Sequence, residues 1–111
     1  MEKYTEKRPW GKFEEYVKNE SCTVKILFVA PGEELSLQYH QQREEFWKIL
    51  QGEAEITIND KIIKAKEDDE FFIPKKAKHR IKTEKGTKVL EISLGKFDEK
   101  DEVRIEDKYK R

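Results

Sequence analysis

One stretch decides the fold of this chain: GEELSLQYHQQREEFWKILQG, which runs from Gly32 to Gly52. Its first part alternates, with apolar side chains on one face of an extended strand (Leu35, Leu37, Tyr39) and polar ones on the other (Ser36, Gln38, His40). The segment 41–44 predicts a turn, and Glu45–Leu50 predicts the returning strand. The stretch therefore predicts an antiparallel pair of strands that brings an amide, an imidazole and a carboxylate close together.

The same alternation continues on both sides of this stretch. It places Cys22, Val24, Ile26 and Phe28 on one face of a strand, and it predicts further strands at Ala54–Ile58, Ile62–Ala65, Phe71–Pro74, His79–Thr83 and Lys88–Leu94. Turn-forming pairs separate these strands, and no window predicts a long amphipathic helix. The fold class is therefore all-β, an antiparallel sandwich or barrel, and the 111 residues predict a single domain, residues 1–111.

The two ends of the chain differ from the middle. Arg8-Pro-Trp-Gly predicts a short N-terminal arm laid over the barrel, with Trp10 packed in the core or in a lid. The tail 98–111 is mostly charged, and its pattern leaves a short strand, a helix and a flap open.

Composition excludes several classes of function. The 24 Lys and Arg balance the 24 Asp and Glu, so no net field favours nucleic acid or anionic lipid as a partner. No stretch is apolar enough for a transmembrane helix, and the first residues do not resemble a signal peptide. Cys22 is the single cysteine, so no intrachain disulfide is possible. We expect a cytoplasmic protein without a membrane partner.

Four polar residues form a candidate metal site. Gln38 and His40 leave the same face of one strand, Glu45 begins the returning strand, and His79 begins a later one. Two imidazoles, a carboxylate and an amide oxygen inside a barrel would bind a borderline divalent cation such as zinc, iron, cobalt, nickel or manganese. Taken singly, each residue fits an ordinary packed or surface position equally well.

The spacing of these residues resembles a known family. Gly32, five residues, Gln38-Tyr39-His40, four residues, Glu45, six residues and Gly52 resemble the first signature of the cupin superfamily, and Pro74, four residues and His79 resemble its second. The flanking motifs (Arg8-Pro-Trp-Gly, Arg43, Ile73-Pro74, Arg104, Asp107, Tyr109 and Arg111) narrow the resemblance to the type II mannose-6-phosphate isomerase domain. The chain departs from the family at Asp68 and Lys76, where glycines are usual, and at Gln41 and Gln42, where histidines are usual.

The resemblance implies a cupin double-stranded β-helix and a metal-dependent isomerase that interconverts mannose 6-phosphate and fructose 6-phosphate. It implies Gln38, His40, Glu45 and His79 as metal ligands, zinc as the first choice of metal, and a homodimer. Arg43, Arg104 and Arg111 are the expected phosphate-binding residues. Glu91 is the expected proton carrier, supported by Arg43, with Glu44 and Asp107 as alternatives.

Two other interpretations stay open. The chain could be a cupin enzyme of another kind, either a dioxygenase or an isomerase of a different phosphosugar. It could also be a sugar-binding module without catalysis, because a cupin fold does not establish a function. Arginines that converge on the site would favour a phosphosugar ligand.

Overall fold

The computed structural model describes residues 2–98 and 100–106, and strands dominate it. The strands are β1 (Tyr4–Arg8), β2 (Gly11–Glu15), β3 (Cys22–Val29), β4 (Leu37–Tyr39), β5 (Arg43–Gly52), β6 (Ala54–Ile58), β7 (Lys61–Ala65), β8 (Glu70–Ile73), β9 (His79–Lys82), β10 (Thr87–Gly95) and β11 (Val103–Glu106). Among the residues described there is no helix, and hence none that could cross a membrane.

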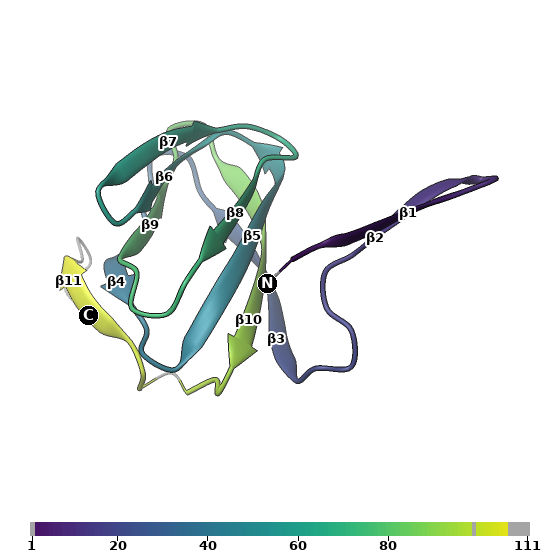
Figure 1. The fold of residues 1–111 in the computed structure, drawn as a ribbon. Helices are drawn as coiled ribbons and strands as arrows, with labels where there is room; N and C mark the ends of the chain where they lie inside the picture. The colour runs from purple at the N-terminus through teal and green to yellow at the C-terminus, as the bar shows by residue number, and fades with distance from the viewer. Residues whose placement is uncertain (1, 99, 107–111) are drawn as a thin grey trace.

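Two antiparallel sheets face each other and enclose the core (Figure 1). One has the strand order β3-β10-β5-β8 and the other the order β11-β4-β9-β6-β7, which is a double-stranded β-helix. The core between them consists mainly of Trp47, Ile49, Ile56, Ile73, Ile81 and Val89. The predicted all-β barrel is therefore confirmed, and its strands lie close to the predicted ranges.

The N-terminal arm differs from the prediction. β1 and β2 form a two-stranded hairpin that extends away from the barrel instead of lying over it (Figure 1). Trp10, at the turn of this hairpin, is 72% exposed, so its prediction as a core or lid residue is wrong. Among the described strands, β1 and β2 pair with each other and with no other strand, and the turn of the hairpin is exposed. Of the three conformations that the sequence left open for the tail, the structure shows a short strand as far as Glu106, because β11 pairs with β4.

The register of β5 against β10 positions the interior polar residues. Glu45 lies opposite Ser93, and Trp47 lies opposite Glu91. Because side chains alternate along a strand, all four point into the barrel, as does Ile49 further along β5. The polar end of this row is the wall on which the candidate site is built.

Two residues at family glycine positions keep the backbone that glycine favours. Asp68 and Lys76 have φ values of 74° and 69°, in the left-handed region. A side chain in this region costs about 1 kcal/mol or more, and less for Asp than for Lys. In the loop before His79, the Lys76 amide donates to the His40 carbonyl oxygen at 2.7 Å.

Candidate metal centre

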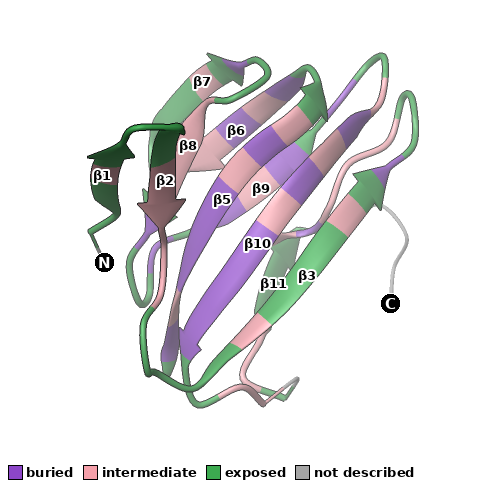
Figure 2. Cartoon of the chain, turned by 90° about the vertical axis from the view of Figure 1, so that its right-hand side faces the viewer, coloured by how far each residue is buried: buried purple, intermediate pink, exposed green. Residues whose placement is uncertain are grey.

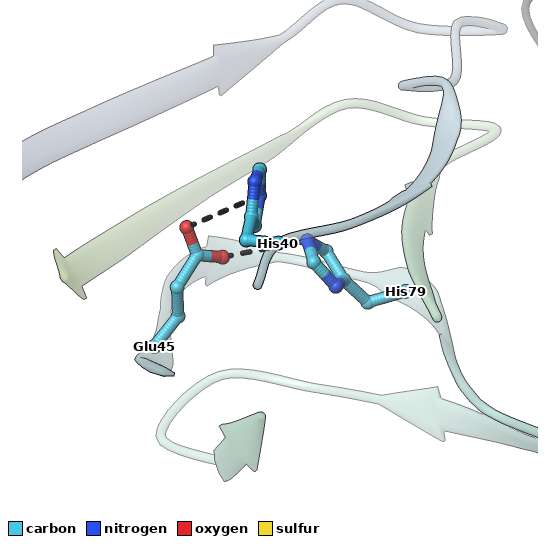
Figure 3. Close-up of side chains that lie close together, drawn as sticks. All are labelled: His40, Glu45 and His79. Carbon is cyan, nitrogen blue, oxygen red and sulfur yellow. Dashed lines mark ion pairs between the residues drawn. The ribbon is translucent and has the colours of Figure 1, made fainter. Parts of the chain in front are cut away.

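Three predicted ligands meet inside the barrel. His40 follows β4, Glu45 lies on β5 and His79 begins β9, and their ligand atoms all lie within 4.8 Å of one another. Their side chains are only 1–3% exposed. Figure 3 shows the Glu45 carboxylate facing both imidazole rings, with Nε2–O distances of 3.7 Å to His40 and 3.5 Å to His79.

Backbone carbonyls fix both imidazoles in the same tautomer. His40 Nδ1 lies 2.8 Å from the Asp101 carbonyl oxygen, and His79 Nδ1 lies 2.9 Å from that of Ala77. A carbonyl can only accept, so both Nδ1 atoms carry the proton and both Nε2 atoms present a lone pair to the cluster. This is the orientation in which protein histidines bind metal through Nε2.

One buried atom in this cluster has no partner. His79 Nε2 makes no hydrogen bond among the described residues, although it is shielded from water. Burial lowers the pKa of His79, which keeps the ring neutral and its lone pair available. An unsatisfied buried acceptor costs free energy, so a cation here would remove a penalty.

The spacing of the three ligand atoms fits such a cation. Bonds of about 2.1 Å at tetrahedral angles separate neighbouring ligand atoms by about 3.4 Å. Glu45 Oε2 lies 3.7 Å from His40 Nε2 and Glu45 Oε1 lies 3.5 Å from His79 Nε2, and one ligand atom from each residue lies within 4.8 Å of the other two. The residues present therefore fit a divalent metal ion.

Neighbouring side chains orient the carboxylate of Glu45. Trp47 Nε1 donates to Oε1 at 3.2 Å, and Ser93 Oγ donates to Oε2 at 3.3 Å. Arg43 Nε also donates to Oε2 at 3.3 Å. These contacts fix the rotamer of a ligand before anything binds to it.

Gln38 faces a different set of partners. Its Cα pairs with those of His79 and Arg104, so it lies on the wall of the site. The amide orientation that satisfies its neighbours has the nitrogen donate to Glu102 Oε1 at 2.9 Å and to Ser36 Oγ at 2.8 Å. Gln38 as a fourth ligand stays a prediction.

Arg43 is a buried neighbour of the ligands. Its Nη2 lies 3.1 Å from His40 Nε2, and its Nη1 donates to the Asp98 carbonyl oxygen at 3.4 Å. The guanidinium also stacks on the Phe97 ring, 4.3 Å from its centroid. The structure therefore places Arg43, one of the expected phosphate-binding residues, against the ligands themselves.

Glu91 points into the barrel on the strand next to Glu45. Burial raises its pKa to about 7, with a further contribution from the Glu45 charge, while Lys25 and Arg43 act in the opposite direction. Glu91 lies opposite Trp47 and is buried, so its side chain faces the interior. Glu44, the first alternative to Glu91, pairs with Leu94 on the outward side of the sheet and faces away from the site.

Of the two tail arginines predicted to bind phosphate, Arg104 and Arg111, the structure describes Arg104. Arg104 lies on β11 opposite Gln38 and makes an ion pair with Glu102, so it stands on the wall beside the cluster. Arg111 and Asp107 lie outside the described residues.

One functional residue was missed by sequence reasoning. Besides its carbonyl contact with His40, Asp101 accepts hydrogen bonds through its carboxylate from the amides of Gln41 and Gln42, at 3.1 and 2.8 Å. It therefore holds the turn that carries His40. No sequence signal distinguishes it from the other acids of the charged tail.

Two solved structures illustrate the similarity in fold. A mutant oxalate decarboxylase of Bacillus subtilis has a TM-score of 0.70 at 24% identity, covering 78% of this chain and 25% of that one. A double-stranded β-helix protein of Klebsiella pneumoniae has a TM-score of 0.64 at 16% identity, covering 71% of each chain. Both show the cupin fold alone.

Curated relatives are more similar in sequence. The mannose-1-phosphate guanylyltransferase ManC of Salmonella typhimurium is 36% identical over 107 residues, covering 94% of this chain and 22% of the relative. The xanthan biosynthesis protein XanB of Xanthomonas campestris is 36% identical over 107 residues, covering 94% and 23%. Mannose-1-phosphate guanylyltransferase 2 of Escherichia coli O157:H7 is 35% identical over 106 residues, covering 93% and 22%. The chain thus spans about a fifth of the length of these relatives.

These names correct the predicted activity. The family resemblance implied a mannose-6-phosphate isomerase, whereas two of these relatives are named as guanylyltransferases, a different enzyme activity. The assignment of the chain as an isomerase enzyme is therefore wrong. The physical reason is that ligand spacing specifies a fold and a candidate metal centre, and many chemistries share these. Glu91 and Arg43 lie beside the cluster, but the roles in isomerisation that were predicted for them are withdrawn.

The family itself is established by a match along nearly the whole chain. A family model described as "Mannose-6-phosphate isomerase C-terminal" covers residues 2–107, which include all three ligands of the cluster, the arm and β11. The chain therefore belongs to the mannose-6-phosphate isomerase C-terminal family of cupin domains.

Proposed function

We propose that this domain binds a divalent metal ion through His40, Glu45 and His79, and a phosphorylated sugar beside it. The observation that carries the proposal is His79 Nε2, a buried lone pair without a partner in the described structure, which points into a cluster with a second Nε2 and a carboxylate. Arg43 already donates to the Glu45 carboxylate and contacts His40 Nε2, so His79 Nε2 is the buried atom of the cluster that a bound cation would satisfy.

The donor set favours a borderline metal. Two imidazole nitrogens and one carboxylate oxygen are typical ligands of zinc, and cobalt, manganese, iron and nickel are accepted by similar sets. Three protein ligands leave a coordination position for an oxygen of a small molecule. When bound, the metal would supply a Lewis acid that holds and polarises that oxygen.

The arginines around the site support a phosphorylated ligand. Arg43 touches the cluster directly, and Arg104 lies on the wall formed by β4 and β11. A guanidinium binds phosphate oxygens in a bidentate manner, which Lys does less well. Two of the relatives carry mannose 1-phosphate in their names, which makes this sugar phosphate the first probe. We assign binding to the domain and no part in nucleotidyl transfer.

Calorimetry of the chelator-treated protein tests both steps. We expect Zn²⁺ or Co²⁺ to bind with one site per chain, and mannose 1-phosphate to bind the metal-loaded protein more tightly than the metal-free protein. His79→Ala should lose the metal and the metal-dependent part of sugar binding. Thr83→Ala, which alters a buried hydroxyl bonded to the Glu53 carbonyl oxygen and the Gly86 amide, is the control and should keep both.

The experiment distinguishes an error about metal binding from an error about sugar-phosphate binding. Absence of metal binding by the wild-type chain would refute the metal centre. Metal binding that leaves the affinity for mannose 1-phosphate, mannose 6-phosphate and inorganic phosphate unchanged would refute the sugar-phosphate site alone.

A further inference from the structure

Arg43 contacts two of the three residues of the metal cluster. Its Nη2 lies 3.1 Å from His40 Nε2, and its Nε donates to Glu45 Oε2 at 3.3 Å. The side chain is only 6% exposed, at the start of strand β5, which Figure 2 shows buried over much of its length. A cation that belongs to the protein itself therefore already faces the ligands.

His40 has one lone pair to offer, and Arg43 uses it. The Asp101 carbonyl oxygen keeps the proton on His40 Nδ1, so the acceptor of the neutral ring is Nε2, with a single lone pair. The Arg43 Nη2 group donates to this lone pair, and a metal ion would need the same one. Coordination by His40 and this hydrogen bond therefore exclude each other. Glu45 is different, because a carboxylate has enough lone pairs for both cations.

The other contacts of Arg43 lie on a partly exposed segment. Phe97 and Asp98, which follow β10, are half-buried. They hold the guanidinium through the Phe97 ring, whose centroid is 4.3 Å away, and the Asp98 carbonyl oxygen at 3.4 Å. The Lys25 ammonium lies 4.6 Å from the centroid of the same ring. Two cations that share one partly exposed ring attract an anion, so a guanidinium that leaves His40 is next to a second positive charge.

We propose that Arg43 leaves His40 when the site takes up a divalent metal ion, and that the released guanidinium then binds the phosphate group of the sugar phosphate beside Phe97. The inference rests on the proposed function and adds the residue that couples its two ligands. Metal alone would leave a guanidinium charge beside a dication, and sugar phosphate alone would have to draw Arg43 away from Glu45. With both ligands present, the phosphate compensates the released charge. Each ligand should therefore raise the affinity for the other by the same factor.

The direction of one change separates displacement from a fixed positioning role. If Arg43 only oriented Glu45, removal of the guanidinium would weaken metal binding. If Arg43 competes with the metal for His40, removal should strengthen it. Glu45 keeps its orientation in the variant, because Trp47 Nε1 and Ser93 Oγ still donate to its carboxylate.

Calorimetric titration of zinc into chelator-treated protein tests the displacement. Arg43→Met keeps an unbranched apolar chain against Phe97 and removes the guanidinium, so it should tighten zinc binding at least about 10-fold. The matched control is Arg80→Met, because the Arg80 side chain is 14% exposed and donates to the Leu35 carbonyl oxygen and Glu106 rather than to a ligand. It should bind zinc like the wild type, and circular dichroism should show both variants folded. Zinc binding by Arg43→Met that is equal to the wild type or weaker would overturn the proposal.

Nitrogen-15 NMR of the wild-type chain gives a second measurement that needs no variant. Zinc should shift the Nε2 signals of His40 and His79, and the Arg43 Nη2 protons should exchange with water faster because they lose their acceptor. Unchanged Arg43 exchange while both histidine signals shift would overturn the displacement and leave the metal centre standing. Histidine signals that do not respond to zinc would refute the metal centre itself, and this inference with it.

Mannose 1-phosphate tests the coupling. It should tighten zinc binding to the wild type at least about 5-fold and leave zinc binding to Arg43→Met nearly unchanged. A factor of the same size in Arg43→Met would show that the sugar phosphate acts on the metal without Arg43, and would overturn the coupling role. Mannose 1-phosphate that does not bind the wild type, with or without zinc, would refute the sugar-phosphate site and this coupling, while the displacement is decided by the zinc titration alone.

Discussion

Replacing His79 by alanine tests the metal centre through stability. His79 contributes one of three ligand atoms and the only one left without a protein partner among the described residues. A metal at 100 times its dissociation constant stabilises the folded state by about 2.7 kcal/mol. For a domain of this size, each kcal/mol raises Tm by about 4–8 °C, so the wild-type chain should gain about 10–20 °C on loading with zinc.

The variant should lose nearly all of this gain. If removal of one imidazole weakens binding by about 100-fold, the same metal concentration leaves RT ln 2, about 0.4 kcal/mol, or about 2 °C. Without metal, the variant is destabilised because it loses the hydrogen bond to the Ala77 carbonyl and the packing of the ring against Trp47. It is also stabilised, because the unsatisfied buried Nε2 atom is removed. We expect these to offset one another in part, at a net cost of about 1–2 kcal/mol, so the fold survives.

Scanning calorimetry with and without zinc, after treatment with a chelator, measures the Tm of the metal-free protein and the gain in Tm on adding zinc. Thr83→Ala should lower the Tm of the metal-free protein while keeping the full zinc-dependent gain. A zinc-dependent gain of equal size in the His79→Ala variant would refute the assignment of His79 as a ligand.

Three further predictions concern neighbours of the site. Asp101→Ala should weaken metal binding by about 10–100-fold in calorimetric titration, because the segment whose carbonyl fixes His40 loses its hold on the amides of Gln41 and Gln42; unchanged affinity would contradict this positioning role. Lys76→Gly should raise the free energy of unfolding by about 1 kcal/mol in urea titration, since Lys76 has a φ of 69°, whereas Lys75→Gly, its neighbour without a positive φ, should not. The pKa of Glu91, raised to about 7 from its ordinary value of 4.5, predicts that metal-free protein loses stability as pH rises between these values, because the folded state holds the proton more tightly. Glu91→Gln should remove this loss, roughly 3 kcal/mol at most, and a variant with the wild-type pH dependence would show that Glu91 is not its source.

Most of the barrel could be predicted from alternation, and the metal cluster from spacing. The strands from β3 to β10 follow the two-residue pattern closely, and the turn after His40 returns Glu45 to the same site. These features are local, because each depends on a strand, a turn and the direction of neighbouring side chains. A sequence therefore specifies them without knowledge of the rest of the fold.

The remainder depended on contacts between distant segments. Alternation placed Val24, Ile26 and Phe28 on one face of a strand, but only the register with β10 shows that this face points outward. The partners of Gln38 come from Ser36 and Glu102, and those of His40 include Asp101 in the tail. The direction of the β1–β2 arm follows from its anchors at Glu70 and Phe46. None of these pairings has a local signature, because each joins segments far apart in the sequence.

Anomalous diffraction from crystals grown with zinc, with data collected on both sides of the zinc absorption edge, tests the central claim most directly. We predict one strong peak per chain inside the barrel, about 2.0–2.2 Å from His40 Nε2, His79 Nε2 and a carboxylate oxygen of Glu45. A map with no peak between these three residues, in crystals that hold zinc elsewhere on the protein, would contradict the account.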